Sequence, residues 1–554
     1  MRDGTRLSVD LYLPEADHPA PAILVRTPYT NTRDDFVAWG RYFPPHGYAV
    51  AIQDVRGRGD SDGVFTPWVD DFEDGYDTVE WVARQSWCDG RVGMLGGSYM
   101  AWVQWTAATR RPPHLVTMVA AGSPGRWGRD WPYRYGAFWA EDYMEWLYRV
   151  SGRSLQLSSI PDWGPVHRSR DLRQLDAQLG QPNPHWQAAL DHPTVDAYWQ
   201  QLTVTGYEKM DWPVLHITGW YDPCAPGSLH HFREMLARSP AADRQALLLG
   251  AWNHGGGCKT GQLVPGSHDA APDASLDLHK VWLEWFDRWL AGRPGARETW
   301  PRVRYYALGG GWRDADGWPP REARLVRLAL HADGSLDVDG RADISGSGDV
   351  DHARLWRTLG RSSAHPTAGT RTYRYAPDDP TPAIPVLDAG PPPDPRAEDL
   401  RFLEARADVL SYTTSPIATP LEVAGSVTLL LHAASSAPDT DFGALLSDVH
   451  PDGRSVLLSF GIRRASFRES LTDPTLLSPH EIYALDLELS DVAHVVRAGH
   501  RLRLTVTSCL FPYYHPNPNT GEPLGAETRR QIAIQTIHHG PEHPSHLALF
   551  VLPG

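Results

Sequence analysis

The distribution of apolar residues divides the chain into regions of different structure. In the first region, short apolar runs at 21–26, 48–53 and 91–95 alternate with helix-like spacing of apolar residues over 71–85 and 99–108. Apolar runs of this length are typical of strands that are buried on both faces of a sheet. Strands that alternate with helices predict a parallel sheet covered by helices on both sides.

A block rich in aromatic residues then interrupts this pattern. Residues 125–150 contain nine Trp, Tyr and Phe side chains, several of them at helical spacing. Apolar strand-like runs return at 214–218 and 245–249, and an amphipathic helix is predicted over 276–290. We infer that a mostly helical segment is inserted into an α/β domain.

Strand patterns dominate the rest of the chain. The segments 426–432, 483–489 and 501–507 are alternating or continuously apolar, and turns rich in Gly, Pro and Asp separate them. This pattern predicts an all-β sandwich, in which the proline-rich stretch 377–395 forms a stiff extended connector. The predicted parts are an α/β core (1–111 and 211–305), a helical cap (112–210) and a β-sandwich (306–554).

Charge and cysteine content restrict the partners and the compartment. The net charge is −15 without a basic cluster, so nucleic acid and anionic membranes are unsuitable partners. No apolar run approaches the roughly 18 residues of a membrane span. The four cysteines, at 88, 224, 258 and 509, have neither disulfide-framework nor zinc-ligand spacing. With no signal-peptide pattern at the start, we expect a cytoplasmic protein. The sequence is compatible with a homo-oligomer but does not decide the oligomeric state.

The segment Gly96-Gly97-Ser98-Tyr99 has the context of a nucleophile elbow. It follows the apolar run 91–95 and precedes a predicted helix. Small residues suit the crowded turn, and the N–H of Tyr99 at the helix start is free to bind an oxyanion. Met100 stands where this motif usually has a second glycine. The same turn also occurs as a simple helix cap, so the motif alone leaves both interpretations open.

An acid and a histidine follow Ser98 in the order of a catalytic triad. Asp222 comes after the run 214–218, and His254 comes after 245–249. Both residues therefore lie at strand ends, on the sheet edge where α/β enzymes place their chemistry. The pairs His230-His231 and His538-His539 lack ligand spacing, and we interpret them as solvent-exposed rather than metal-binding. We expect no metal and no cofactor.

These motifs resemble the bacterial cocaine esterase group of α/β-hydrolases. That group also includes α-amino acid ester hydrolases, glutaryl acylases and Xaa-Pro dipeptidyl-peptidases. The resemblance spans essentially the whole chain, although most relatives have a further strand before residue 1. The matching segments are MRDG (1–4), RTPY (26–29), DVRGRG (54–59), WCDGRVGM (87–94), GGSY (96–99), GWYD (219–222), WNH (252–254), APDTDF (437–442), DVHPDG (448–453) and NPNTG (517–521).

The resemblance implies an α/β-hydrolase core with an inserted helical cap and a C-terminal all-β jelly-roll domain. It implies that Ser98 is the nucleophile, that His254 is the general base and then acid, and that Asp222 orients the imidazole. It also implies an oxyanion hole made by the Tyr29 hydroxyl and the Tyr99 N–H.

The resemblance also suggests where the substrate binds. Trp131 and Trp146 correspond to two cap tryptophans that line an acyl pocket, and Cys224 stands where that branch has Phe. The amino-acid ester hydrolases bind the substrate ammonium with carboxylates just after the catalytic Asp, where this chain has Pro223-Cys224-Ala225-Pro226. An ammonium site would have to use cap acids such as Asp130, Glu141 or Asp142.

The sequence therefore predicts a serine hydrolase for a small ester with an aromatic or bulky apolar acyl group. An amidase, acylase or Xaa-Pro dipeptidyl-peptidase with the same triad is an alternative. A non-catalytic carbohydrate-binding protein, with tryptophans that stack on sugar rings, is an alternative of another class.

Overall fold

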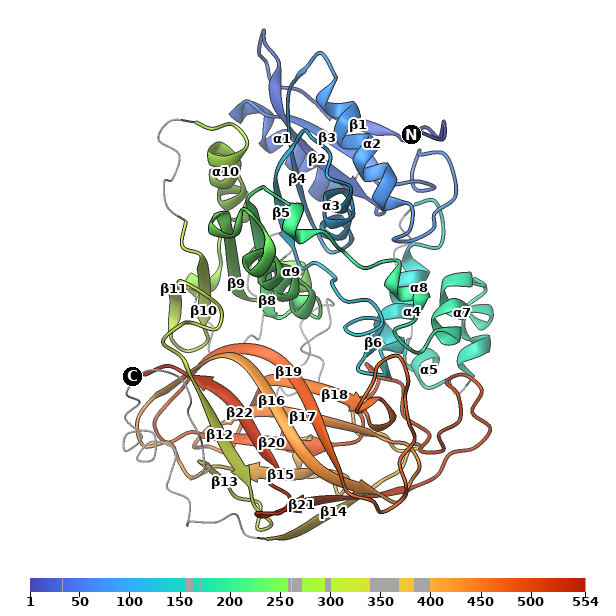
Figure 1. Ribbon diagram of the computed structural model, residues 1–554, viewed down its shortest axis with the longest axis vertical. Coiled ribbons are helices and arrows are strands. Elements are labelled where there is room, and N and C mark those ends of the chain that lie inside the picture. Colours follow the sequence, from blue (N-terminus) through green and yellow to red (C-terminus); the bar gives the residue numbers. More distant parts are fainter. Residues whose placement is uncertain are drawn as a thin grey trace.

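The computed structural model describes residues 1–31, 33–154, 163–169, 171–257, 261, 272–293, 300–338, 368–382 and 399–553. Figure 1 shows the α/β core in blue and green, the cap in cyan at its side, and the all-β part in orange and red below both. The arrangement confirms an α/β-hydrolase core with a helical insertion and a C-terminal β-sandwich. None of the helices in these ranges is both long and apolar enough to cross a membrane.

A nine-stranded sheet forms the centre of the α/β core. Its middle strands are parallel, and the outermost strand at each edge is antiparallel to its neighbour. Each predicted apolar run of this region coincides with a strand to within one residue, because these strands are buried on both faces; only the run 48–53 begins one residue before its strand. The order across the sheet is β1 (Val9–Tyr12), β3 (Ala49–Asp54), β2 (Ala20–Thr27), β4 (Cys88–Gly97), β5 (Leu115–Ala121), β8 (Val214–Tyr221), β9 (Gln245–Asn253), β10 (Val303–Ala307) and β11 (Gly311–Ala315).

Two strands belong to the α/β core, although the predicted domain boundaries assign them to the cap and to the sandwich. The predicted cap (112–210) includes β5, but this strand pairs in parallel with β4 and β8 inside the core sheet. The predicted sandwich (306–554) includes β11, but this strand pairs with β10 at the edge of the core sheet. Both predicted boundaries depended on a change in local pattern, and pairing with strands distant in sequence leaves no local signal.

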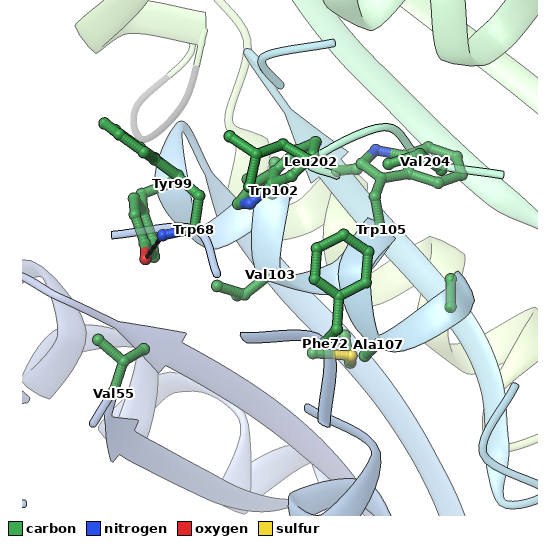
Figure 2. Packing of buried hydrophobic residues seen from close by; sticks show 14 of the residues in the cluster. Val55, Trp68, Phe72, Tyr99, Trp102, Val103, Trp105, Ala107, Leu202 and Val204 are labelled. Atoms are coloured by element: carbon green, nitrogen blue, oxygen red, sulfur yellow. Dashed lines mark hydrogen bonds between the residues drawn. The ribbon is translucent and has the colours of Figure 1, made fainter. Parts of the chain in front are cut away.

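Helices cover both faces of this sheet. On one face, α1 (Asp34–Tyr42) and α10 (Leu278–Trp289) contribute Trp39, Trp282 and Trp285 to a common core. On the other face lie α2 (Asp71–Ala83), α3 (Tyr99–Arg110) and α9 (Ala225–Arg238). Figure 2 shows the buried side of α3, where Trp102 and Trp105 pack against Leu202 and Val204 from the end of the cap. Packing on both sides fixes the strand ends that carry the predicted chemistry.

The cap is a set of short helices preceded by a small ribbon. Residues 125–139 do not form the predicted helix: Tyr133–Arg134 (β6) and Ala137–Phe138 (β7) pair in an antiparallel ribbon. Their aromatic side chains point into the cap core rather than along one helix face. The helices are α4 (Ala140–Arg149), α5 (Gly164–His167), α6 (Leu175–Gln178), α7 (Pro184–Asp191) and α8 (Ala197–Gln200).

The C-terminal part is a sandwich of two main sheets. The predicted strands 426–432, 483–489 and 501–507 lie within β16, β19 and β20. The larger sheet contains β13 (Leu336–Val338), β12 (Arg324–Leu330), β22 (His546–Val551), β16 (Leu421–Ser435), β21 (Ala533–His539) and β14 (Gly369–Tyr375), with β19 (Tyr483–Val496) beside β16. The smaller contains β15 (Leu410–Thr413), β20 (Arg501–Thr507), β17 (Asp441–Val449) and β18 (Ser455–Arg464), and α12 (Arg401–Glu404) precedes it. Most of the proline-rich connector, from residue 383, lies outside the described residues.

The two histidine pairs are not simply solvent-exposed. His231 is buried, stacks on Trp105 and lies 2.7 Å from the Tyr207 hydroxyl. His539 is buried beside Tyr412, with the ring nitrogen 3.0 Å from the phenol oxygen. Burial lowers the pKa of both imidazoles, so they pack as neutral aromatic rings. The prediction of exposure was wrong for these two members because adjacent side chains point in different directions from a helix or a strand, so one member of each pair is turned into the core.

Candidate active site

Ser98 occupies a strained turn between β4 and α3. Its backbone has φ 63° and ψ −128°, a conformation that costs energy for any residue with a Cβ. The Ser98 N–H donates to the Ala121 carbonyl at 2.8 Å, which fixes the turn to β5. A Cβ on Gly96 would lie 2.4 Å from the Met100 Cβ, so glycine is required there. This is the geometry of a nucleophile elbow, with Met100 in place of the usual second glycine.

Tyr29 lies next to Ser98 on the loop that follows β2. Its hydroxyl oxygen is 3.5 Å from Ser98 Oγ, and the indole N–H of Trp146 donates to the same hydroxyl at 3.2 Å. The loop is held from behind by Arg58, which donates to the Pro28 carbonyl at 2.7 Å and to the Val150 carbonyl at 2.7 Å. The Tyr29 hydroxyl therefore lies beside the serine oxygen, at the junction of core and cap.

Tyr99 offers its backbone rather than its side chain to this site. The buried phenol accepts a hydrogen bond from the Trp68 N–H at 2.9 Å (Figure 2) and donates to Asp71. Burial raises the pKa of the Asp71 carboxyl to about 6, although Arg26 and Tyr99 oppose the shift. The Tyr99 N–H makes no backbone hydrogen bond within the described residues, as expected in the first turn of a helix.

Asp222 and His254 meet directly after the strands β8 and β9. His254 Nδ1 lies 2.7 Å from Asp222 Oδ1. Because a carboxylate only accepts, Nδ1 carries the proton and Nε2 is left as the basic nitrogen. The same Asp222 oxygen accepts the Cys224 N–H at 2.8 Å, and the other accepts the Thr218 hydroxyl at 3.0 Å. The carboxylate is buried, while a quarter of the His254 side chain is exposed.

The predicted substrate residues lie around this centre. Trp131 and Trp146 are partly exposed, and their rings are 5.9 Å apart and nearly perpendicular. Trp131 shares with Cys224 a cavity of about 10 Å³, which holds one water molecule at most. Trp131 thus occupies much of the space beside the small Cys224 side chain.

Among the residues that the structure describes, three groups of side chains have donor atoms close enough to hold a metal ion, within 4.8 Å of one another. In each group a histidine already pairs with an acid: His254 with Asp222 at 2.7 Å, His500 with Asp448 at 3.0 Å and His167 with Glu145 at 3.3 Å. These contacts between a histidine and an acid account for the clustering. The groups are Asp222, Cys224 and His254; Asp448, His450 and His500; and Glu141, Glu145 and His167.

Two supporting residues escaped the sequence reasoning. Thr218 donates to Asp222 from inside β8, and Arg58 fixes the Tyr29 loop. The sequence offered one weak signal for Thr218: it is a hydroxyl residue in the otherwise mostly apolar run 214–218. Arg58 entered the sequence analysis only as part of the matching segment 54–59, because its two carbonyl partners, on Pro28 and Val150, are distant in sequence.

Comparison with known proteins decides the family. The family model for X-Pro dipeptidyl-peptidase (S15 family) matches residues 3–256, and that for the X-Pro dipeptidyl-peptidase C-terminal non-catalytic domain matches residues 294–548. Cocaine esterase from Rhodococcus sp. (strain MB1 Bresler) is 34% identical over 588 aligned residues, which cover 100% of this chain and 97% of that protein. The chain belongs to the cocaine esterase family of α/β-hydrolases.

Solved structures agree with this membership of the cocaine esterase family. An α-amino acid ester hydrolase is 26% identical, with a TM-score of 0.82 over 100% of this chain and 95% of that one. An aminopeptidase from a Thaumarchaeota archaeon of marine sediment, 24% identical, has the same fold, with a TM-score of 0.83 and coverage of 100% and 95%. The family matches thus make the chain a serine hydrolase, either an esterase or a dipeptidyl-peptidase. This answers the choice between an enzyme and a carbohydrate-binding protein in favour of the enzyme.

Proposed function

We propose that this protein hydrolyses small carboxylic esters through an acyl intermediate on Ser98. The observation that supports it best is the 2.7 Å contact of His254 Nδ1 with the buried Asp222, at the same sheet edge as the strained Ser98. A histidine held in this tautomer has Nε2 as its basic nitrogen, which is the atom that takes the serine proton in a catalytic triad.

In this reaction each residue of the site has a defined role. His254 removes the Ser98 proton as Oγ attacks the ester carbonyl, and it returns the proton to the leaving alcohol. The tetrahedral oxyanion receives hydrogen bonds from the Tyr29 hydroxyl and the Tyr99 N–H. Asp222 stabilises the imidazolium that forms in each half-reaction. In the second half-reaction, His254 removes a proton from water as the water attacks the acyl-Ser98 carbonyl. The proton then returns to Ser98 Oγ, and the carboxylic acid is released.

The aromatic wall supports an aromatic or bulky apolar acyl group. Trp131 and Trp146 are the large apolar side chains that remain partly exposed beside Tyr29 and Cys224. Apolar surface at the site favours acyl groups that bury area against it, at roughly 25 cal/mol per Å².

Amide cleavage is a second candidate, favoured by the match to a dipeptidyl-peptidase family model. The same triad serves both reactions, because the difference lies in the leaving group. Turnover of a 4-nitrophenyl ester beside an Xaa-Pro 4-nitroanilide compares the two directly. A higher kcat/KM for the anilide would replace the esterase proposal by a peptidase.

The catalytic assignment is tested by three substitutions. Ser98→Ala and His254→Ala should each lower kcat by roughly 10⁴ or more, and Asp222→Asn somewhat less, with non-additive effects. A fluorophosphonate should label the natural protein but not the Ser98→Ala variant. Equal thermal midpoints would show that the variants are folded. If Ser98→Ala keeps more than a tenth of the activity, the mechanism is wrong.

Net charge and cysteine content bear on the partners and the cellular compartment of the enzyme. We propose a small-molecule ester as its partner, with no nucleic acid or membrane surface, on the basis of the net charge of −15. Cys88 and Cys509 are buried free thiols, which fits a reducing compartment such as the cytoplasm.

A further inference from the structure

The turn between β8 and α9 places a thiol next to the acid and the base of the proposed triad. Cys224 Sγ, a carboxylate oxygen of Asp222 and a ring nitrogen of His254 all lie within 4.8 Å of one another. The contact of His254 with Asp222 is the one that the proposed reaction needs. The Cys224 thiol has no role in that acyl transfer, so the mechanism does not explain the third donor atom of the group.

The backbone of the turn holds Cys224 close to the acid. Asp222 Oδ1 accepts the Cys224 N–H at 2.8 Å, and the Asp222 carbonyl accepts the Ala225 N–H at 2.9 Å. A carboxylate that accepts the N–H two residues ahead closes an Asx turn. Pro223 and Pro226 restrict the same segment further, because the proline ring fixes φ. The turn therefore brings the thiol and the carboxylate together without help from any ligand.

Exposure and charge at this group suit a cation. Cys224 is partly exposed, and so is a quarter of the His254 side chain, so an ion can reach the group from solvent. Within the part of the chain that the structure describes, Asp222 has no Lys or Arg partner at 4.0 Å or less, and its ionic contact is with His254. The carboxylate thus contributes a negative charge that no fixed cation of the protein neutralises.

Sulfur distinguishes this group from the other two groups of possible ligands, which offer nitrogen and oxygen atoms only. A thiolate selects soft or borderline ions such as Zn²⁺ over Mg²⁺ and Ca²⁺. Three protein ligands from Cys, His and Asp, with water in the fourth position, form a usual set for Zn²⁺. Ligands 2.0–2.3 Å from a tetrahedral ion lie about 3.3–3.7 Å apart, so shifts of about 1 Å bring these donor atoms into place.

We propose that Cys224, His254 and Asp222 bind one thiophilic divalent cation, such as Zn²⁺, and that the bound ion inhibits the enzyme. This inference rests on the proposed function of the same site and adds inhibition by a metal ion to it. Cys224 gives the chain this property, since the Phe of the resembling branch has no ligand atom in its side chain.

A bound ion removes the base from the triad whichever ring nitrogen of His254 it takes. An ion on Nε2 occupies the lone pair that accepts the serine proton. An ion on Nδ1 displaces the proton of that nitrogen to Nε2, which leaves the imidazole neutral but no longer a base toward Ser98. Cys224 binds as the thiolate. The protein ligands therefore release one proton to solvent, from the thiol, for each ion that binds.

Absorption by bound Co²⁺ tests the site without any substrate. Co²⁺ replaces Zn²⁺ in such sites, and a thiolate ligand gives it a charge-transfer band in the near ultraviolet. We expect this band in the natural protein at one Co²⁺ per chain, and its loss when Zn²⁺ is added in excess. Cys224→Ser should lack the band. The matched control Cys88→Ser removes a buried thiol at the opposite end of β4 from Ser98 and should keep it.

Inhibition tests whether the ion acts on the triad. Zn²⁺ should inhibit hydrolysis of a neutral 4-nitrophenyl ester and slow the labelling of Ser98 by a fluorophosphonate. EDTA should reverse both effects, and Mg²⁺ at the same concentration should cause neither. Each protein is compared with its own metal-free rate, because residue 224 is also a predicted substrate contact. The apparent Ki for Zn²⁺ should be at least tenfold weaker in Cys224→Ser and unchanged in Cys88→Ser.

Alkylation provides a readout that needs no substitution. Iodoacetamide modifies partly exposed thiols, and mass spectrometry identifies the modified residue. Zn²⁺ should slow the modification of Cys224 in the natural protein at least tenfold, and Mg²⁺ should not. This measurement decides the inference if Cys224→Ser does not fold.

The outcomes separate this inference from the proposed function. Absence of the thiolate band, its persistence in Cys224→Ser, or alkylation of Cys224 at the same rate with Zn²⁺ would each overturn the metal site. Absence of inhibition, or equal inhibition of the natural protein and Cys224→Ser, would overturn its effect on the triad. Failure of the esterase proposal would appear in the metal-free natural protein as absence of ester turnover, while the Co²⁺ band and the alkylation still report on the metal site.

Discussion

At the residue scale, Trp146 makes a contact that its sequence-based interpretation does not include. The resemblance predicts a wall of the acyl pocket, and in the structure the indole N–H also donates to the Tyr29 hydroxyl at 3.2 Å. Indole is a donor only, so the Tyr29 oxygen accepts and its own proton is left to point elsewhere. Ser98 Oγ lies 3.5 Å from that hydroxyl. Trp146 thus fixes the phenol rotor and strengthens it as a donor.

The first prediction at this scale couples Tyr29 and Trp146. Tyr29→Phe should lower kcat by roughly 10²–10³ with little change in KM, because the lost bond forms only in the transition state. Trp146→Phe should lower kcat about tenfold by itself and have no further effect in a Tyr29→Phe background. Steady-state kinetics of the four proteins in a double-mutant cycle measure the coupling.

Trp131→Phe is the control for this cycle, since its indole donates to Asp142 and not to Tyr29. Its effect on kcat should add to that of Tyr29→Phe. A Trp146→Phe variant with a raised KM and an unchanged kcat would mean that Trp146 acts as a pocket wall alone and does not support Tyr29. A raised KM in Tyr29→Phe would make Tyr29 a substrate-binding residue.

At the element scale, the strand ends were the predictable part of the site. Apolar runs located β4, β8 and β9, and the residues that follow these strands are Ser98, Asp222 and His254. Contacts between elements were not predictable. The bond from Trp131 to Asp142 joins the ribbon region to α4, and no periodicity within either segment signals it.

In the turn after β8, the size of the side chain at residue 224 should determine which acyl groups are accepted. Cys224 follows Asp222 at the start of α9, where a larger side chain would enter the cavity of about 10 Å³ that it shares with Trp131. A phenyl ring does not fit that volume and must displace Trp131 or project toward the substrate. Cys224→Phe should therefore penalise bulky acyl esters while sparing acetyl and butyryl esters.

We expect the selectivity to change at least about tenfold, since one methylene in a pocket is worth about 1–3 kcal/mol. The kcat/KM values of 4-nitrophenyl esters of increasing acyl size measure it, with Cys224→Ala as the control for loss of the thiol. Uniform loss across the series would mean that the ring displaces Asp222, whose Oδ1 accepts the Cys224 N–H at 2.8 Å. An unchanged profile would place residue 224 outside the acyl site.

At the scale of the whole molecule, the order of the parts was predictable and their contacts were not. Pattern changes along the chain separated core, cap and sandwich, because each has its own periodicity. The cap and the sandwich meet through residues far apart in sequence, such as Trp139, whose ring lies 5.3 Å from that of Tyr514. Such contacts depend on tertiary packing, which a single sequence does not encode in any local pattern.

An ionic network at this junction joins the cap to the sandwich. Glu488 of β19 lies 3.2 Å from Arg129 and 3.5 Å from Arg126, and it accepts the Tyr135 hydroxyl. Burial alone raises the pKa of Glu488, but the charges of Arg134, Arg126 and Arg129 and the Tyr135 hydroxyl outweigh it and lower the pKa to about 2. The carboxylate is therefore the shared anion of several cap arginines.

The last prediction concerns the stability that this carboxylate contributes. A pKa depressed from 4.5 to about 2 on folding stabilises the folded state above pH 4.5, and the contribution is lost as the pH falls from 4.5 toward 2. Discounted for the 31% exposure of the Glu488 side chain, this contribution amounts to roughly 2 kcal/mol at pH 7.

Glu488→Gln should lower the free energy of unfolding by about that amount at pH 7, and by less below pH 4.5. Urea unfolding at both pH values measures the difference, with the exposed Glu469→Gln as the control. A constant difference at both pH values would mean that packing of the side chain, and not its charge, joins the sandwich to the cap.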